Sequence, residues 1–249
     1  MEIKISRYRI VIARKSRPTS FVEAAKLTNT FFQRIALLDD LFKEIILVNA
    51  SSNKNLLLNY QDYEYDAETL GEIYFKKFKY WLKKMYPNEK HDKYSTKHYG
   101  ILVMLVTIGK PLENISFTFN LGNNNSLDSI SIVFPPKDFV RDFDWYKKLL
   151  ETAIDVFEPD YACLYPTIMD LKLEPPRPCG GWISYFSDKI SLPQNIFDGY
   201  VPIDFGNKTM YAIEDNHKIQ KDENQFEKLR IMVEKFKELD KSKIENVFY

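Results

Sequence analysis

The sequence predicts an α+β protein: a single domain over residues 1–249 with a mixed, mainly antiparallel sheet and about four helices. Three observations lead to this prediction. Four segments carry apolar residues spaced three and four apart, which is the period of one helix face. Several short segments alternate apolar and polar residues, as half-buried strands do. No internal repeat, low-complexity tract or linker divides the chain into self-sufficient halves.

The first quarter of the chain predicts a strand, a helix and a second strand. Residues 3–13 are rich in β-branched side chains and predict the first strand. Ser20 and Glu23 form a capping box, in which the serine oxygen accepts a backbone N–H of the first turn and the glutamate reaches back. The apolar stripe of the helix that follows extends to Phe42, and residues 44–48 predict a short strand after it.

The second quarter predicts a lysine-rich helix and three strands. Asp66 is the predicted N-cap of this helix, whose apolar stripe includes Trp81 and ends at Met85, before a proline. We expect the stripe to face the core, with a cationic membrane helix as the alternative. Residues 99–108 are nearly all apolar, which predicts a central strand buried on both faces. Residues 115–121 and 130–134 alternate in polarity around a Gly- and Asn-rich loop, which predicts a hairpin with one face in water.

The second half predicts two helices separated by a proline-rich stretch. Apolar residues at helical spacing over residues 145–156 predict the third helix, which Pro159 ends. Residues 159–202 contain seven of the twelve prolines, so we expect loops and short strands there. Residues 208–213 predict a last strand, and residues 226–236 present the apolar face of a final helix.

Composition and charge narrow the class of function. Lysine plus arginine and aspartate plus glutamate each number 35, so no net field favours nucleic acid or an anionic membrane as a partner. The first residues are charged, where a secretory signal needs an apolar run, and no segment has membrane-spanning length. We therefore expect a cytoplasmic protein in which Cys163 and Cys179 are free thiols.

One pattern suggests an enzyme. Pro159-Asp160 followed by Asp170-Leu171-Lys172 matches the loose pattern of restriction-type nucleases, where two acids hold magnesium and a lysine assists the attacking water. The pattern is short, and a chain rich in Asp, Glu and Lys matches it by chance. A magnesium-dependent nuclease using Asp160, Asp170 and Lys172 is the alternative to a binding function.

Other chemistry has less support in the sequence. His91, Asp92 and His98 lie in one polar stretch, but the gap between the histidines fits no common zinc spacing, and a solvated loop explains them. No phosphate-binding loop or nucleophile elbow is present, so the sequence predicts no metal, no cofactor and no catalytic residue. The pair Gly180-Gly181 is expected to serve a tight turn or a close backbone approach before a strand.

A segment before the second helix has the composition of a protein-binding patch. Tyrosines and acids alternate there, and tyrosine offers a large, rigid contact area while carboxylates pair with basic partners. The predicted partner-binding residues are Asp62, Tyr63, Glu64, Tyr65 and Asp66. The alternative explanation is that Asp66 caps the helix and Glu64 favours its positive end.

The sequence resembles the immunity protein 52 family of bacterial polymorphic-toxin and type VI secretion systems. The resemblance lies in Gly181-Trp182-Ile183-Ser184-Tyr185-Phe186, then Leu192-Pro193, then Val201-Pro202-Ile203. Segments 13–16 and 158–162 agree with it. We take Gly180, Gly181, Trp182 and Tyr185 as a structural motif.

The resemblance implies a non-enzymatic antitoxin that binds and neutralises a toxin encoded by an adjacent gene. The toxin of such a pair is typically a nuclease of restriction-endonuclease fold, and the family supplies no catalytic residues. A protein-interaction module unrelated to toxins is the other alternative. The sequence leaves the oligomeric state open.

Overall fold

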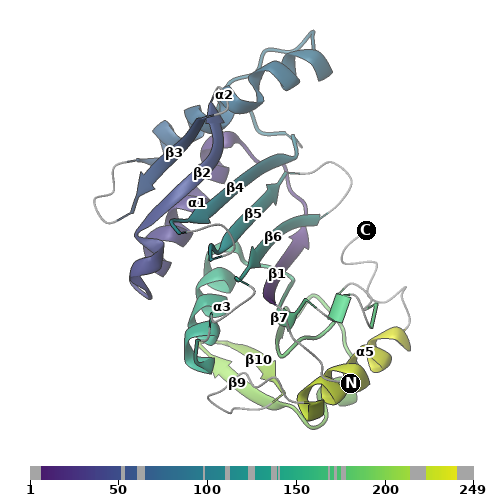
Figure 1. The fold of residues 1–249 in the computed structure, drawn as a ribbon. Helices are drawn as coiled ribbons and strands as arrows, with labels where there is room; N and C mark the ends of the chain where they lie inside the picture. The colour runs from purple at the N-terminus through teal and green to yellow at the C-terminus, as the bar shows by residue number, and fades with distance from the viewer. Residues whose placement is uncertain are drawn as a thin grey trace. The chain divides into compact units, whose positions relative to one another are not determined.

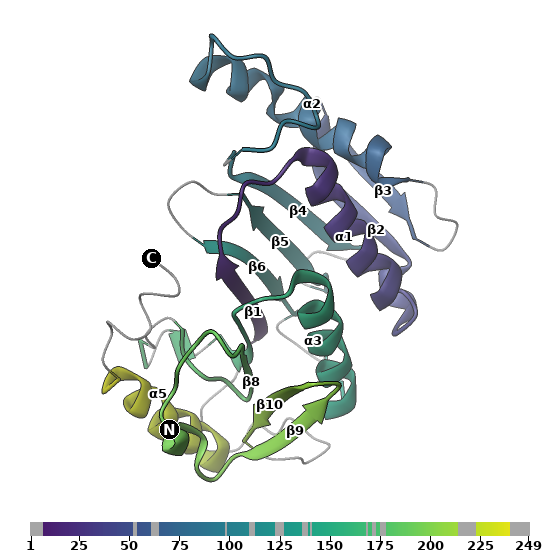
Figure 2. The ribbon, with the colours of Figure 1, turned by 180° about the vertical axis from the view of Figure 1, so that it is seen from behind.

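The computed structural model describes residues 7–51, 54–60, 65–97, 99–109, 113–122, 127–135, 139, 141–167, 169–170, 173–174, 178–213 and 223–239. Its contacts cluster into two compact units, drawn in Figures 1 and 2. We call residues 15–131 the middle unit, and residues 1–14 with 132–249 the terminal unit. This division does not test the single-domain prediction, which stays a prediction.

The predicted fold class is confirmed. Four α-helices and ten strands are present in the described part of the chain, and every strand pair with a described register is antiparallel. No described helix is both long enough and apolar enough to cross a membrane.

The middle unit is a sheet with two helices. Its strand order is β3-β2-β4-β5-β6. The elements in chain order are α1 (Phe21–Ile35), the short 3-10 helix η1 (Asp40–Phe42), β2 (Glu44–Ser51), β3 (Lys54–Asn59), α2 (Ala67–Met85), β4 (Ile101–Thr107), β5 (Ser116–Leu121) and β6 (Leu127–Val133). The boundary between the units falls within β6, so this strand contributes residues to both.

Side-chain caps determine where the helices of the middle unit begin. The Ser20 hydroxyl accepts the Glu23 N–H at 3.1 Å and the Glu23 carboxylate accepts the Ser20 N–H at 2.7 Å, which confirms the capping box. The Asp66 carboxylate caps α2 by accepting the Thr69 N–H at 2.7 Å. Helix α1 is shorter than predicted, because Asp39 accepts the Leu41 N–H and begins η1 as a separate turn.

Both helices of the middle unit pack on one face of its sheet. The ring of Phe32 in α1 meets that of Phe117 in β5 at 4.9 Å, edge to face. Helix α2 lies beside α1, where the Tyr74 hydroxyl hydrogen-bonds to Thr28 at 3.0 Å. Figure 2 shows this helix-covered face, and Figure 1 shows the same strands from the side that no described helix covers.

One sequence prediction in the middle unit is wrong, and one strand was not predicted. The strand predicted over residues 99–108 to be buried on both faces is β4, and it alternates: Leu102 and Met104 are each 42% exposed. The helices cover one face of the sheet only, which explains the difference. Strand β3 was not predicted, because its sequence, KNLLLN, has neither clear alternation nor β-branched residues.

The last turn of α2 also differs from prediction. Trp81 and Met85 belong to the predicted core-facing stripe but stay 40% and 54% exposed, while Leu82 is buried. The Trp81 ring contacts Tyr86, just after the helix, at 6.2 Å.

The terminal unit is a second antiparallel arrangement, with strand order β1-β7-β8-β10-β9. Its elements are β1 (Tyr8–Lys15), of which Lys15 belongs to the middle unit, α3 (Phe143–Phe157), β7 (Tyr161–Pro166), β8 (Ile183–Phe186), the 3-10 helix η2 (Gln194–Phe197), β9 (Val201–Phe205), β10 (Lys208–Ala212) and α5 (Glu223–Lys237). Strand β7 is buried along its whole length, because β1 and β8 pair with it and α3 packs on it. Helix α5 joins this core where Phe236 stacks on Phe186 of β8, ring centroids 5.6 Å apart.

Candidate protein-binding surface

The predicted tyrosine–acid segment is only partly described. Asp62, Tyr63 and Glu64 lie outside the described residues, so their place in a toxin-binding patch stays a prediction. The described members have structural contacts. Asp66 is the N-cap of α2, and the hydrogen bonds from Thr69 lower the pKa of its carboxyl. The Tyr65 carbonyl accepts from the Asn29 amide at 3.3 Å.

The paired glycines of the family-like motif allow close packing in the terminal unit. A Cβ built on Gly181 would lie 3.0 Å from the carbonyl carbon of Leu164 in β7, and closer still to its oxygen. One built on Gly180 would collide with the side chain of Met232 in α5. The close backbone approach expected from the sequence is therefore present at Gly181, whereas Gly180 faces the flexible end of a methionine side chain.

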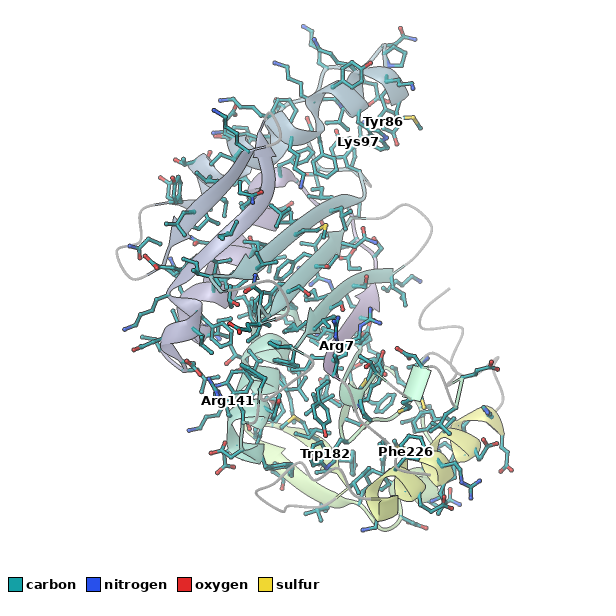
Figure 3. All side chains as sticks on the ribbon, viewed as in Figure 1. Arg7, Tyr86, Lys97, Arg141, Trp182 and Phe226 are labelled. Carbon is teal, nitrogen blue, oxygen red and sulfur yellow. The ribbon has the colours of Figure 1, made fainter. Side chains whose placement is uncertain are left out.

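The aromatic residues of the same motif also belong to the core. Trp182, which Figure 3 labels, lies in the terminal unit. It is 3% exposed, and its ring lies 5.8 Å from that of Tyr8. The Trp182 backbone N–H donates to the Leu164 carbonyl at 2.6 Å, whereas its indole N–H has no hydrogen-bond partner among the described residues. Tyr185 is buried too, with its ring 6.5 Å from Phe205. The motif therefore builds the terminal unit and offers no binding surface.

The carboxylates of the alternative nuclease pattern are not brought together. Asp160 directly precedes β7 and Asp170 follows it, and six strand residues at about 3.3 Å each separate the two ends by roughly 20 Å. The ligands of one magnesium ion lie at about 2.1 Å from it. The carboxylates of Asp160 and Asp170 are therefore too far apart to bind the same ion. Lys172 lies outside the described residues.

Each of these aspartates has basic or hydroxyl neighbours of its own. Asp160 is buried and accepts from the Lys189 ammonium at 2.9 Å. Asp170 accepts from the Tyr165 hydroxyl at 3.1 Å and lies 3.7 Å from the Arg9 guanidinium. These contacts give both acids a structural role in the terminal unit.

His91 is placed by hydrogen bonds with two tyrosines. Its Nδ1 lies 3.1 Å from the Tyr99 hydroxyl and its Nε2 lies 3.3 Å from the Tyr86 carbonyl (Figure 3 labels Tyr86). Asp92 caps the following turn through the Tyr94 N–H at 2.9 Å, and His98 is outside the described residues. Across the described residues, no three His, Cys, Asp or Glu side chains cluster as metal ligands would. Cys163 and Cys179 are both buried, and neither forms a disulfide.

The uncovered side of the middle-unit sheet is the surface that the sequence did not predict. Leu57 of β3, Ile46 of β2 and Val106 of β4 lie side by side across three strands, because Ile46 pairs with both of the others. Leu102 and Met104 extend this group along β4. We call these five residues the aliphatic band. Leu57 is 47% exposed, and Ile46 and Val106 are half-buried.

Polar side chains continue the same side of the sheet. The register pairs Leu102 with Asn120 and Met104 with Thr118, so the aliphatic band borders directly on β5. Most outward residues of β5 and β6 carry hydroxyl or amide groups, and we call these the polar band: Ser116, Thr118, Asn120, Ser129 and Ser131. The two ends of β6, Leu127 and Val133, are apolar. The two bands together form the open face. Its exposed aliphatic residues are unusual, because a solvent-facing antiparallel sheet face is normally polar.

The open face was missed because the sequence signal is ambiguous. An all-apolar strand such as β4 is expected to be buried on both faces of its sheet. The same sequence also occurs in a strand that is covered on one face only, and the number of covering layers decides between the two. The number of helices is a signal that could have revealed the open face. The middle unit has only two helices for a five-stranded sheet, and both lie on the same face, so the other face has no helix to cover it.

Comparisons with known proteins assign this chain to no family. No protein-family model matches the chain, and no curated protein matches it. Among solved structures, a match is the Pseudomonas aeruginosa T6SS protein PA0821, with 10% sequence identity and a TM-score of 0.48, covering 91% of this chain and 76% of that chain. At that identity and TM-score, no function follows for this chain from the likeness.

Proposed function

We propose that this protein is an immunity protein, which binds a toxin encoded by an adjacent gene and neutralises it by forming a stoichiometric complex. The observation that carries the proposal is the open face, a partly aliphatic and exposed sheet surface of the kind that proteins use to bind one another. The sequence resemblance to the immunity protein 52 family supplies the kind of partner.

The proposal also specifies the toxin and the cellular location of the complex. Following the resemblance, the toxin is a nuclease of restriction-endonuclease fold that a neighbouring bacterium delivers by type VI secretion, and the complex forms in the cytoplasm. No cofactor and no catalytic residue take part. Trp182 and Asp160 of the family-like segments are buried. This agrees with a role in stabilising the fold, which is what the resemblance implies for them.

Protection from the toxin tests the proposal. The adjacent toxin gene is expressed in a susceptible bacterial host with and without this protein, and survival and co-purification are measured. We expect survival and a complex with the wild-type protein, and neither with Gly181→Asp, in which the core of the terminal unit cannot close. Death of the host despite soluble wild-type protein, with no complex recovered, would contradict the proposal.

A further inference from the structure

The open face is depleted of charge. In the whole chain 28% of residues are charged. Among the described outward-facing residues of β2, β4, β5 and β6, only Glu44 is charged, and it stands at the beginning of β2. Depletion of charge with enrichment of methionine and aliphatic side chains is typical of the centre of an interface. A face that evolved for water alone would carry lysines and glutamates instead.

This composition specifies the chemistry of the surface that covers it. A charged partner group placed over Leu102 or Met104 would lose its water and gain no counter-charge, which is costly. An apolar partner group there gains from burial. Opposite the polar band, hydrogen-bonding groups are needed so that Thr118 and Asn120 do not stay unsatisfied when water leaves.

The size of the face suits a separate protein as occupant. Five strands at about 4.8 Å spacing and about six residues at 3.4 Å give a sheet area of roughly 24 by 20 Å. This area of about 480 Å² is smaller than the ~800 Å² that one partner contributes to a standard complex, so the open face can supply the centre of such an interface and not all of it. The mixture of an aliphatic and a polar band is typical of proteins that also exist apart, because permanent dimers bury a more uniformly apolar surface.

We propose, resting on the proposed function, that the toxin docks on the open face through an uncharged surface with an apolar centre and a hydrogen-bonding flank. Apolar burial on the aliphatic band then supplies the affinity. Charge steering contributes little, so the complex is insensitive to ionic strength.

Charge-introducing variants test the contact. The probe is the purified, catalytically inactivated toxin domain encoded by the adjacent gene, and binding is measured by calorimetry and surface plasmon resonance. In Leu102→Lys with Met104→Lys, the lysines stay solvated in the free protein, because both positions are 42% exposed. We expect the Kd to rise more than about 100-fold. Leu102→Thr with Met104→Thr keeps β-propensity and removes apolar area, and should raise the Kd about tenfold.

Matched controls separate this effect from charge or solubility changes elsewhere. Leu37→Lys with Ile231→Lys makes the same chemical change at residues that are 84% and 48% exposed and lie off the open face. We expect less than about a threefold change in Kd for this pair. For the wild type, the Kd should change less than about threefold between about 50 and 500 mM salt.

The outcomes distinguish this inference from the proposed function. Toxin binding that survives the Leu102 and Met104 variants, but falls with salt and in Asp62→Lys with Glu64→Lys, overturns the inference and leaves the immunity role standing. Absence of any binding or protection by the wild type overturns the immunity role itself. A wild-type dimer that the lysine pair converts to a monomer by analytical ultracentrifugation overturns the inference, because a second copy then occupies the face.

Discussion

Replacing Gly181 by alanine tests the structural role of the family-like motif. The added methyl would lie 3.0 Å from the Leu164 carbonyl carbon and 3.2 Å from the Cys163 Cβ, both in β7. Leu164 cannot move away freely, because its carbonyl accepts the Trp182 N–H at 2.6 Å. Overpacking of this kind costs about 1–3 kcal/mol, and a weakened hydrogen bond adds about 1 kcal/mol. We therefore expect a loss of about 2–4 kcal/mol of unfolding free energy.

Thermal unfolding followed by circular dichroism measures this loss. For a chain of this size, 1 kcal/mol corresponds to about 2–4 °C in Tm, so Gly181→Ala should lower the Tm by roughly 4–16 °C. The control is Gly206→Ala, where no described atom lies within 4 Å of the added methyl. It costs only the strain of a φ of +60°, about 1–2 kcal/mol. A Gly181 variant that melts with the wild type, or above Gly206→Ala, would refute the close approach of β7 and the motif.

Three further predictions concern buried aromatic residues. Trp182→Phe should cost less than about 1.5 kcal/mol in chemical denaturation, against about 3–5 kcal/mol for Trp182→Ala, because phenylalanine also removes an indole N–H without a described partner. Tyr74→Phe should lower the unfolding free energy by about 1 kcal/mol, because it removes the hydrogen bond to Thr28. Tyr60→Phe should leave the unfolding free energy unchanged, because the Tyr60 hydroxyl has no described partner. Equal losses in the two variants would contradict this prediction. Burial raises the pKa of Tyr60 and Tyr74. The stability that these residues contribute is therefore complete below about pH 10 and falls above it, where the tyrosines of the unfolded chain ionise. A Tm that does not decline at alkaline pH would contradict the burial of these two residues.

The sequence was most informative where structure depends on neighbouring residues. The capping box of Ser20 and Glu23 and the N-cap Asp66 were predicted correctly, because a cap involves residues three apart. The end of α1 was missed by about two turns, because the predicted stripe extends to Phe42 and the helix ends at Ile35. Asp39 competes there for the backbone, and the apolar stripe alone does not reveal it.

The candidate site depends on contacts that the sequence does not encode locally. Leu102 and Met104 are exposed because no second layer covers β4, and a run of apolar residues has the same sequence whether one or two faces are covered. The neighbour of Gly180 likewise comes from far along the chain, as the side chain of Met232 in α5. The sequence indicated a close approach at the glycines but not the element that approaches.

Titration of toxin activity by the purified protein tests the central claim most directly. The activity of the toxin domain encoded by the adjacent gene is measured on plasmid DNA at a fixed concentration, well above the Kd, while this protein is added in steps. We predict that activity falls linearly and reaches its end point at one fixed molar ratio, as tight stoichiometric binding requires. Toxin activity that remains unchanged at a large molar excess of folded protein would contradict the account.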